Sequence, residues 1–196
     1  NVRRPNHWNT SWDQARFESV GHRFADLSER NYGVALLNDC KYGYDVKGNV
    51  LRLSLLRSGK HPDHVQDIGE HFFTYSLLPH AEDIVGGNVV RSAYALNNPM
   101  ILAAGAEKAA DGSFFTVDNP QIEIDAVKKS EDGKYLVIRF HDFAGSSQKV
   151  TVKPEFRFRS WAEGDLRERR LGETQKTGPV AAELHPYEIK TILFEI

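Results

Sequence analysis

Residues 31–80 read NYGVALLNDCKYGYDVKGNVLRLSLLRSGKHPDHVQDIGEHFFTYSLLPH and carry the clearest structural signals of the chain. Residues 50–56 mix alternation with a fully apolar end, which is typical of a strand buried on one face and partly on the other. Residues 72–78 are rich in aromatic and β-favouring types, and we expect the strand to end at Pro79. Residues 58–63 between them have the composition of a loop. The stretch therefore predicts β-structure.

A hairpin is predicted inside the same stretch. Residues 45–49 (DVKGN) have turn chemistry, and the arms on either side are residues 34–44 and 50–57.

The second half of the chain repeats the strand pattern more cleanly. Apolar residues alternate with polar ones on both sides of the turn at residues 131–133, and two later strands are expected. The predicted segments of this half are residues 121–126, 136–141, 149–152 and 188–196.

Residues 13–29 are open to two interpretations. Phe17, Val20, Phe24 and Leu27 have the spacing of an amphipathic helix, but Gly21 and the mixed faces weaken it. Strands dominate elsewhere, so the chain is expected to be all-β.

A domain boundary is predicted within residues 103–120. Small and polar residues accumulate there, and Pro120 then precedes the first clean hairpin. We place the division between residues 110 and 111, which gives predicted domains 1–110 and 111–196.

Composition excludes several classes of function. Hydrophobic content of 40%, charged content of 27% and a net charge of −2 are ordinary for a globular protein. A net charge close to zero gives no indication of a basic surface that would bind nucleic acid or an anionic membrane. Cys40 stands alone, which excludes a disulfide within the chain and favours a reducing compartment. No apolar run approaches the ~18 residues needed to cross a bilayer.

The N-terminal residues have the character of a chain interior. Residues 1–5 enter directly into a dense aromatic and polar segment, without Met or a charged-then-apolar leader. We expect an internal fragment of a longer protein, and we expect the sequon at Asn9 to be unused.

Metal and nucleophilic chemistry have weak support. The obvious candidates for a metal site lie in a Pro-containing loop region, without H-E-x-x-H and without a helix to align them. They are His61, His64, His71, His80, Asp63, Asp67 and Glu70. Cys40 has no defined His partner and is expected to be a buried, inert thiol. No Ser lies in a G-x-S-x-G turn, and no phosphate-binding glycine motif is present.

Carboxylates and aromatic residues offer a second kind of site. A retaining glycosidase needs two carboxylates about 5–5.5 Å apart, but Asp39 and Asp45 lie in turns, where carboxylates are usually solvated or capping. Tyr42 and Tyr44 could stack on sugar faces or simply pack. Arg57 could hold a sugar hydroxyl or a carboxylate of another domain, or it could pair with Asp39 or Asp63.

Residues 7–12 form a concentrated aromatic and polar group around Trp8 and Trp12. If these side chains are exposed, they suggest a carbohydrate-binding platform or a face docked on another domain. If they are buried, they are part of the hydrophobic core. We favour a domain contact.

The quoted stretch, with RPNHWNTSWDQARFE at residues 4–18, resembles the C-terminal part of a glycoside hydrolase family 38 α-mannosidase of the cytosolic and bacterial type. The resemblance is weaker over residues 92–99 (SAYALNNP), slight from 113 to 185, and returns at residues 184–191 (LHPYEIKT).

The resemblance implies a fold and a division of labour. It implies strands rather than a helix in residues 13–29, the second part of a large β-supersandwich over 1–110, and a small C-terminal β-sandwich over 111–196. The family's nucleophile and its zinc or other divalent cation belong to an N-terminal domain, so no catalytic residue, metal ligand or cofactor is assigned to this chain. The positions that match the family's active-site mouth are residues 38–44 and Arg57, and the candidates among them to lie near the substrate are Asp39, Lys41, Tyr42, Gly43, Tyr44 and Arg57.

Two functions remain in view. The first is a non-catalytic region of a retaining α-mannosidase that removes terminal α-linked mannose from oligosaccharides in the cytoplasm. Its partners would be that glycan and the missing N-terminal domains of the same polypeptide, not nucleic acid or membrane. The second is an independent carbohydrate-binding or interaction β-sandwich. On the first interpretation the isolated chain is expected to bind no stoichiometric zinc and to hydrolyse no mannoside.

Overall fold

The computed structural model describes all residues except 5, 103, 106–111 and 177. Of the described residues, 43% lie in strands and 7% in helices, which confirms the predicted all-β fold. They form two compact units, an N-terminal unit of Val2–Ala104 and a C-terminal unit of Gly105–Ile196 that includes Asn1. The predicted boundary between residues 110 and 111 lies outside the described residues and stays a prediction.

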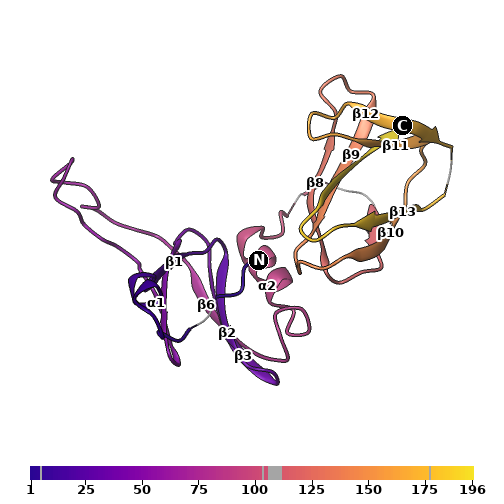
Figure 1. Cartoon of the computed structure of the whole chain (residues 1–196). Helices are drawn as coiled ribbons and strands as arrows, with labels where there is room; N and C mark the ends of the chain where they lie inside the picture. Colours follow the sequence, from indigo (N-terminus) through magenta and orange to yellow (C-terminus); the bar gives the residue numbers. More distant parts are fainter. Residues whose placement is uncertain (5, 103, 106–111, 177) are drawn as a thin grey trace. The chain divides into compact units, whose positions relative to one another are not determined.

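The N-terminal unit contains two antiparallel sheets of three strands each, in the orders β1-β4-β5 and β2-β3-β6 (Figure 1). The helix α2 covers one face of the second sheet, where Ala35 and Leu37 pack against Val89 and Ala93. The elements in chain order are α1 (Ser11–Ala15), β1 (Glu18–Val20), β2 (Phe24–Ser28), β3 (Tyr32–Asn38), β4 (Gly43–Lys47), β5 (Val50–Leu53), β6 (Tyr75–Ala81) and α2 (Val89–Asn97).

The predicted hairpin is present, but its first arm is shorter than expected. β4 pairs with β5 across a two-residue turn in which Gly48 has φ +58°. Residues 34–38 belong to β3, which pairs with β2 and β6 in the other sheet, so the prediction of one arm over residues 34–44 was wrong. The backbone changes sheets at Asp39-Cys40, where the buried amide of Asn38 holds a turn.

The strand boundaries in this region also differ from the predictions. β5 ends at Leu53, and the two leucines at positions 55 and 56 are exposed. β6 begins at Tyr75 and continues through Pro79 to Ala81. Proline is accommodated because β6 is the edge strand of its sheet and has one side without a ladder partner.

Helices are short where the structure describes them, and neither α1 nor α2 could cross a membrane. α1 begins with a capping box, in which the Thr10 hydroxyl accepts from the Asp13 N–H and the Asp13 carboxylate accepts from the Thr10 N–H. β1 and β2 follow it, so strands prevail over the helical interpretation of residues 13–29. α2 was not predicted.

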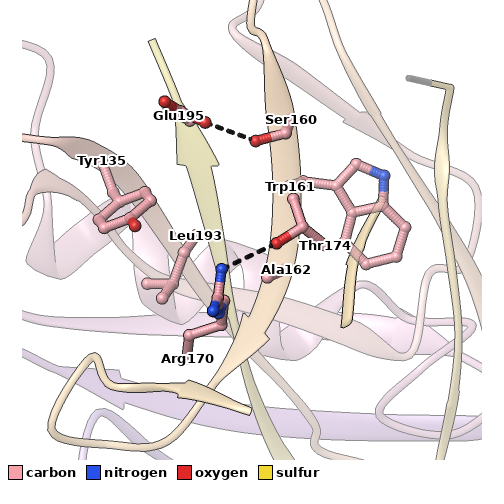
Figure 2. A pocket seen from close by; sticks show the side chains of 8 residues that line it. All are labelled: Tyr135, Ser160, Trp161, Ala162, Arg170, Thr174, Leu193 and Glu195. Carbon is pink, nitrogen blue, oxygen red and sulfur yellow. Dashed lines mark hydrogen bonds between the residues drawn. The ribbon is translucent and has the colours of Figure 1, made fainter. Parts of the chain in front are cut away.

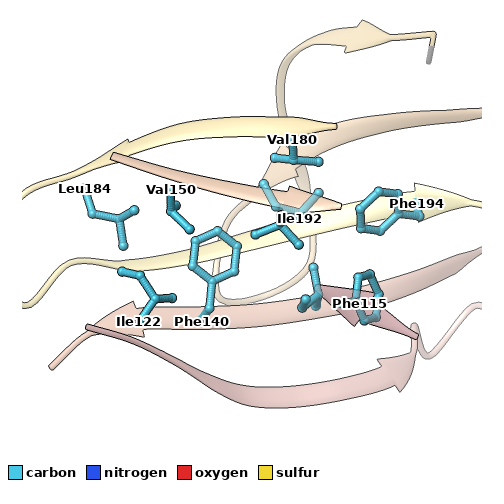
Figure 3. Close-up of a cluster of buried hydrophobic side chains, with 10 residues drawn as sticks. Phe115, Ile122, Phe140, Val150, Val180, Leu184, Ile192 and Phe194 are labelled. Atoms are coloured by element: carbon cyan, nitrogen blue, oxygen red, sulfur yellow. The ribbon is translucent and has the colours of Figure 1, made fainter. Parts of the chain in front are cut away.

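The C-terminal unit is a β-sandwich, as predicted. A five-stranded sheet in the order β12-β11-β14-β9-β8 faces a three-stranded sheet in the order β13-β10-β7. Buried side chains from both sheets, among them Phe140, Phe194 and Val150, fill the space between them (Figure 3). The strands are β7 (Phe115–Val117), β8 (Ile122–Lys129), β9 (Tyr135–Asp142), β10 (Gln148–Pro154), β11 (Ser160–Gly164), β12 (Arg170–Gln175), β13 (Val180–Leu184) and β14 (Ile189–Glu195).

The strands predicted in this half match β8, β9, β10 and β14, and the predicted hairpin is the antiparallel pair β8–β9. The alternating pattern places Ile138, Phe140, Ile192 and Phe194 in the core. Here the sequence pattern determines the packing directly, because each strand has one face buried against the opposite sheet.

Candidate functional site

The turn that connects β3 to β4, residues 39–43, is shaped by one buried side chain. The Asn38 side-chain amide donates to the Tyr44 hydroxyl, and its carbonyl oxygen accepts from the Lys41 N–H at 2.6 Å. The Asn38 backbone carbonyl accepts from the Asn97 side chain in α2 at 2.9 Å. The 39–43 turn, which holds most of the predicted substrate-proximal residues, is therefore fixed to β4 and α2.

Asp39 is bound to the start of β6. Both of its carboxylate oxygens lie 3.0 Å from the Thr74 N–H, and the Asp39 N–H donates to the Thr74 carbonyl at 3.2 Å. Hydrogen bonds from the Cys40 thiol and from Thr74 lower the pKa of the Asp39 carboxyl. Asp39 is therefore ionised at neutral pH and engaged within the chain.

Cys40 is exposed, which corrects the expectation of a buried thiol. Its hydrogen bond to Asp39 raises the pKa of the thiol. Because the thiolate is the nucleophilic form, a raised pKa makes Cys40 less reactive.

Lys41 and Tyr42 each contact one aromatic ring. The Lys41 ammonium lies 4.9 Å from the centre of the Phe73 ring, close enough for a cation–π interaction. Tyr42 stacks on His22, with ring centres 4.8 Å apart and an interplanar angle of 30°. Tyr42 remains half exposed, so part of its ring is accessible to a ligand.

Tyr44 and Gly43 differ from Tyr42. Tyr44 is only 2% exposed, and its hydroxyl donates to the Leu36 carbonyl at 3.4 Å. It packs, so its ring is not available for stacking on a sugar. A Cβ added at Gly43 would meet Ser54 at an ordinary 3.4 Å, so the space there does not require glycine.

Arg57 is exposed and lies in the long segment 54–74 between β5 and β6, visible as the extended purple loop in Figure 1. Neither expected partner is used, because Asp39 binds Thr74 and the Asp63 carboxylate accepts from the Val65 N–H at 3.0 Å. Within the described residues, Arg57 has no hydrogen bond or ion pair. Its guanidinium therefore retains its donors for a group outside these residues.

The loop histidines do not converge. His71 contacts the Asp67 carbonyl at 3.0 Å, whereas His80 pairs with Asp26 in β2 at 2.8 Å. In the part of the chain that the structure describes, no group of three or more His, Cys, Asp or Glu side chains is arranged to hold a metal ion.

The N-terminal aromatic group is not a core. The Lys47 ammonium lies 4.6 Å from the centre of the Trp8 ring, and the side chain of Trp12 is largely exposed.

A small cavity opens in the C-terminal unit beside β11, β12 and β14 (Figure 2). Its polar groups are largely paired with one another, since Arg170 donates to Thr174 at 3.1 Å and Ser160 donates to Glu195 at 2.7 Å. Its volume of about 30 Å³ has room for about one water molecule, not for a sugar ring. The lining residues are Tyr135, Ser160, Trp161, Ala162, Arg170, Thr174, Leu193 and Glu195.

The sequence singled out Asn38 with its neighbours but not its role in holding the turn, and it gave no indication of His22, Phe73 and Thr74, which contact the 39–43 turn. Asn38 left a signal, because it is the first polar side chain after the apolar run of β3. The other three lie about 20 to 35 positions away in sequence, and only the fold brings them together.

Two family models match the chain. "Glycosyl hydrolases family 38 C-terminal domain" matches residues 1–65, and "Glycosyl hydrolases family 38 C-terminal beta sandwich domain" matches residues 121–192, which together make up more than two thirds of the chain. Alpha-mannosidase G of Dictyostelium discoideum is 57% identical over 97 residues, which is 50% of this chain and 9% of the relative. Human Alpha-mannosidase 2C1 is 54% identical over 100 residues, which is 51% of this chain and 10% of the relative.

A solved structure has the same fold. An alpha-mannosidase from Enterococcus faecalis V583 superposes with a TM-score of 0.76 and 24% identity, over 99% of this chain and 23% of the other. The part of this chain that aligns with Alpha-mannosidase G and with human Alpha-mannosidase 2C1 spans about a tenth of the length of each of these relatives.

Proposed function

Because this chain belongs to the C-terminal region of glycosyl hydrolase family 38, we propose that it is the non-catalytic C-terminal part of a retaining α-mannosidase. The observation that carries the proposal is the sequence identity to two proteins named as alpha-mannosidases. It is 57% and 54% over about half of this chain. The parent enzyme would remove terminal α-linked mannose from oligosaccharides in the cytoplasm.

The N-terminal unit would dock on the remainder of the polypeptide. Its 54–74 segment displays apolar side chains that find no cover within the unit, with Phe72 89% exposed, and Trp12 and Leu77 add to them. A soluble protein rarely leaves so much apolar surface in water unless another surface covers it.

The 39–43 turn and Arg57 would help to shape the substrate pocket. Tyr42 offers an accessible ring face, and Arg57 offers a guanidinium that has no hydrogen bond or ion pair among the residues that the structure describes. Asp39 and Lys41 would act through the backbone geometry that they hold, because their side chains already contact Thr74 and Phe73. Tyr44 would support the turn from the core.

Zinc or another divalent cation is proposed for the catalytic region outside this chain. The described histidines and carboxylates lack the convergence of three or four ligands that zinc needs. Hydrolysis would then require residues that this chain does not supply.

The experiment compares this 196-residue chain with the complete parent enzyme, each assayed on an aryl α-mannoside and for bound zinc. We expect the parent to cleave the substrate with retention of anomeric configuration, and the chain alone to show neither activity nor stoichiometric zinc. Hydrolysis by the purified chain, or a complete parent without mannosidase activity, would overturn the proposal.

The alternative, an independent carbohydrate-binding module, is favoured by the exposed rings of Tyr42 and Trp12. It predicts saturable binding of mannose oligosaccharides to the isolated chain by calorimetry, which the first proposal does not expect.

A further inference from the structure

His80 and Asp26 form a buried pair in the N-terminal unit, away from the 39–43 turn. The His80 Nε2 lies 2.8 Å from an Asp26 carboxylate oxygen, and the two side chains are only 3% and 6% exposed. The pair connects β6 to β2, the two outer strands of their sheet, across the central strand β3.

The surrounding backbone is fitted to the imidazole. Gly33 of β3 lies opposite His80 in the ladder, and a Cβ there would clash with the ring. A Cβ on Gly87, in the turn before α2, would clash with the ring from another side. The absence of both side chains lets His80 reach Asp26 while remaining enclosed.

Both ring nitrogens of His80 face acceptors. Nε2 contacts the Asp26 carboxylate, and Nδ1 lies 3.2 Å from the Ala81 carbonyl oxygen. A carbonyl oxygen and an ionised carboxylate oxygen can only accept, so this arrangement favours a ring with a hydrogen on each nitrogen, the imidazolium. The other oxygen of Asp26 accepts from the Ser28 hydroxyl at 2.7 Å, which fixes the carboxylate in turn.

The charged groups around the ring favour this protonated form. Burial opposes protonation, but the hydrogen bonds to Asp26 and Ala81 and the negative charges of Asp26 on β2 and Asp83 after β6 together raise the pKa of His80. β3 and the turn before α2 face the ring with Gly33 and Gly87.

We propose that the His80–Asp26 pair is a proton-dependent clamp that holds β6 to β2 and anchors the turn leading into α2. This role does not depend on the mannosidase proposal. The folded state binds the proton more tightly than the unfolded chain does. The stabilisation is therefore complete below the usual histidine pKa of about 6.5, and it is lost as the pH rises through the folded-state pKa.

The direct test is ¹⁵N-histidine NMR of the unmodified chain, with the His80 signals assigned by through-bond correlation to the backbone. We expect the His80 ring to titrate above pH 6.5, the ordinary pKa of histidine. Titration at or below that value would overturn the clamp, and this outcome does not depend on whether any variant folds.

Hydrogen exchange of the β2, β6 and α2 amides supplies the second readout. After correction for intrinsic rates, protection should fall by up to about tenfold per pH unit between the two pKa values, and His80→Gln should abolish this fall. The matched control is His141→Gln, which removes a pair with Asp125 of equal length, 2.8 Å, whose side chains are 24% and 32% exposed. Its exchange in β2, β6 and α2 should keep the wild-type pH dependence. An unchanged pH dependence in His80→Gln would contradict the proposal.

Discussion

Asn38 and Asp142 are buried polar residues whose hydrogen bonds set the local backbone. Asn38 does so at the 39–43 turn. Asp142 is fully buried, and its carboxylate accepts from the N–H groups of residues 144–146 at 2.8 to 3.1 Å and of Tyr187 at 3.0 Å. Without the Asp142 carboxylate, these backbone N–H groups would have to find another hydrogen-bond acceptor or remain unpaired, which costs free energy.

Asp142→Ala should destabilise the C-terminal unit by about 3 kcal/mol or more, because several backbone donors lose their acceptor at once. The measurement is urea unfolding followed by Trp161 fluorescence, with Trp8 and Trp12 both replaced by Phe. Asp132→Ala is the control, since Asp132 accepts from Ser130 and Lys134 in an exposed turn. Equal losses for the two variants would contradict this explanation.

The two tyrosines show why residue roles in the candidate set were hard to predict. Tyr42 and Tyr44 are two positions apart, which on one strand would give them the same face. β4 begins only at Gly43, so Tyr42 lies in the turn and stacks on His22 while Tyr44 enters the core. Burial depended on a strand boundary that the sequence pattern did not define.

At the scale of elements, alternation was a guide to some of the strands that have one buried face, but it did not identify β11 or β13, which are only five residues long. It predicted β8, β9, β10 and β14. It missed α2, because that helix has nine residues, begins with two β-branched valines and buries mainly Val89, Val90 and Ala93. It also merged β3 with β4, since nothing in the local pattern marks a change of sheet.

The packing of α2 on β3 gives an element-scale prediction. Ala93 is fully buried against Ala35 and Leu37, so Ala93→Leu should overpack the contact and cost about 1–3 kcal/mol. Ala95→Leu makes the same change at an exposed position of the same helix and should have little effect. Opening free energies from exchange of the β3 amides provide the measurement. A smaller loss for Ala93→Leu than for Ala95→Leu would show that α2 is not packed in this way.

At the scale of the whole chain, the family and the all-β fold were predictable because residues 4–80 and 184–191 retain its characteristic stretches. The role of the candidate site was less predictable, since its proposed function depends on groups outside the chain. Arg57 is the most informative residue in this respect, because it is exposed and has no hydrogen bond or ion pair among the described residues.

The decisive measurement is the steady-state kinetics and thermal stability of Arg57→Ala in the complete parent enzyme, on one preparation. A guanidinium that holds a sugar hydroxyl or a carboxylate contributes about 1.5–3 kcal/mol, so kcat/KM should fall about tenfold or more while the melting temperature changes little. Arg52→Ala is the matched control, because Arg52 is an exposed arginine on β5 already paired with Asp45 at 2.6 Å, and its loss should leave kcat/KM nearly unchanged. Unchanged kinetics with a lowered melting temperature for Arg57→Ala would contradict the account and leave the region a purely architectural role.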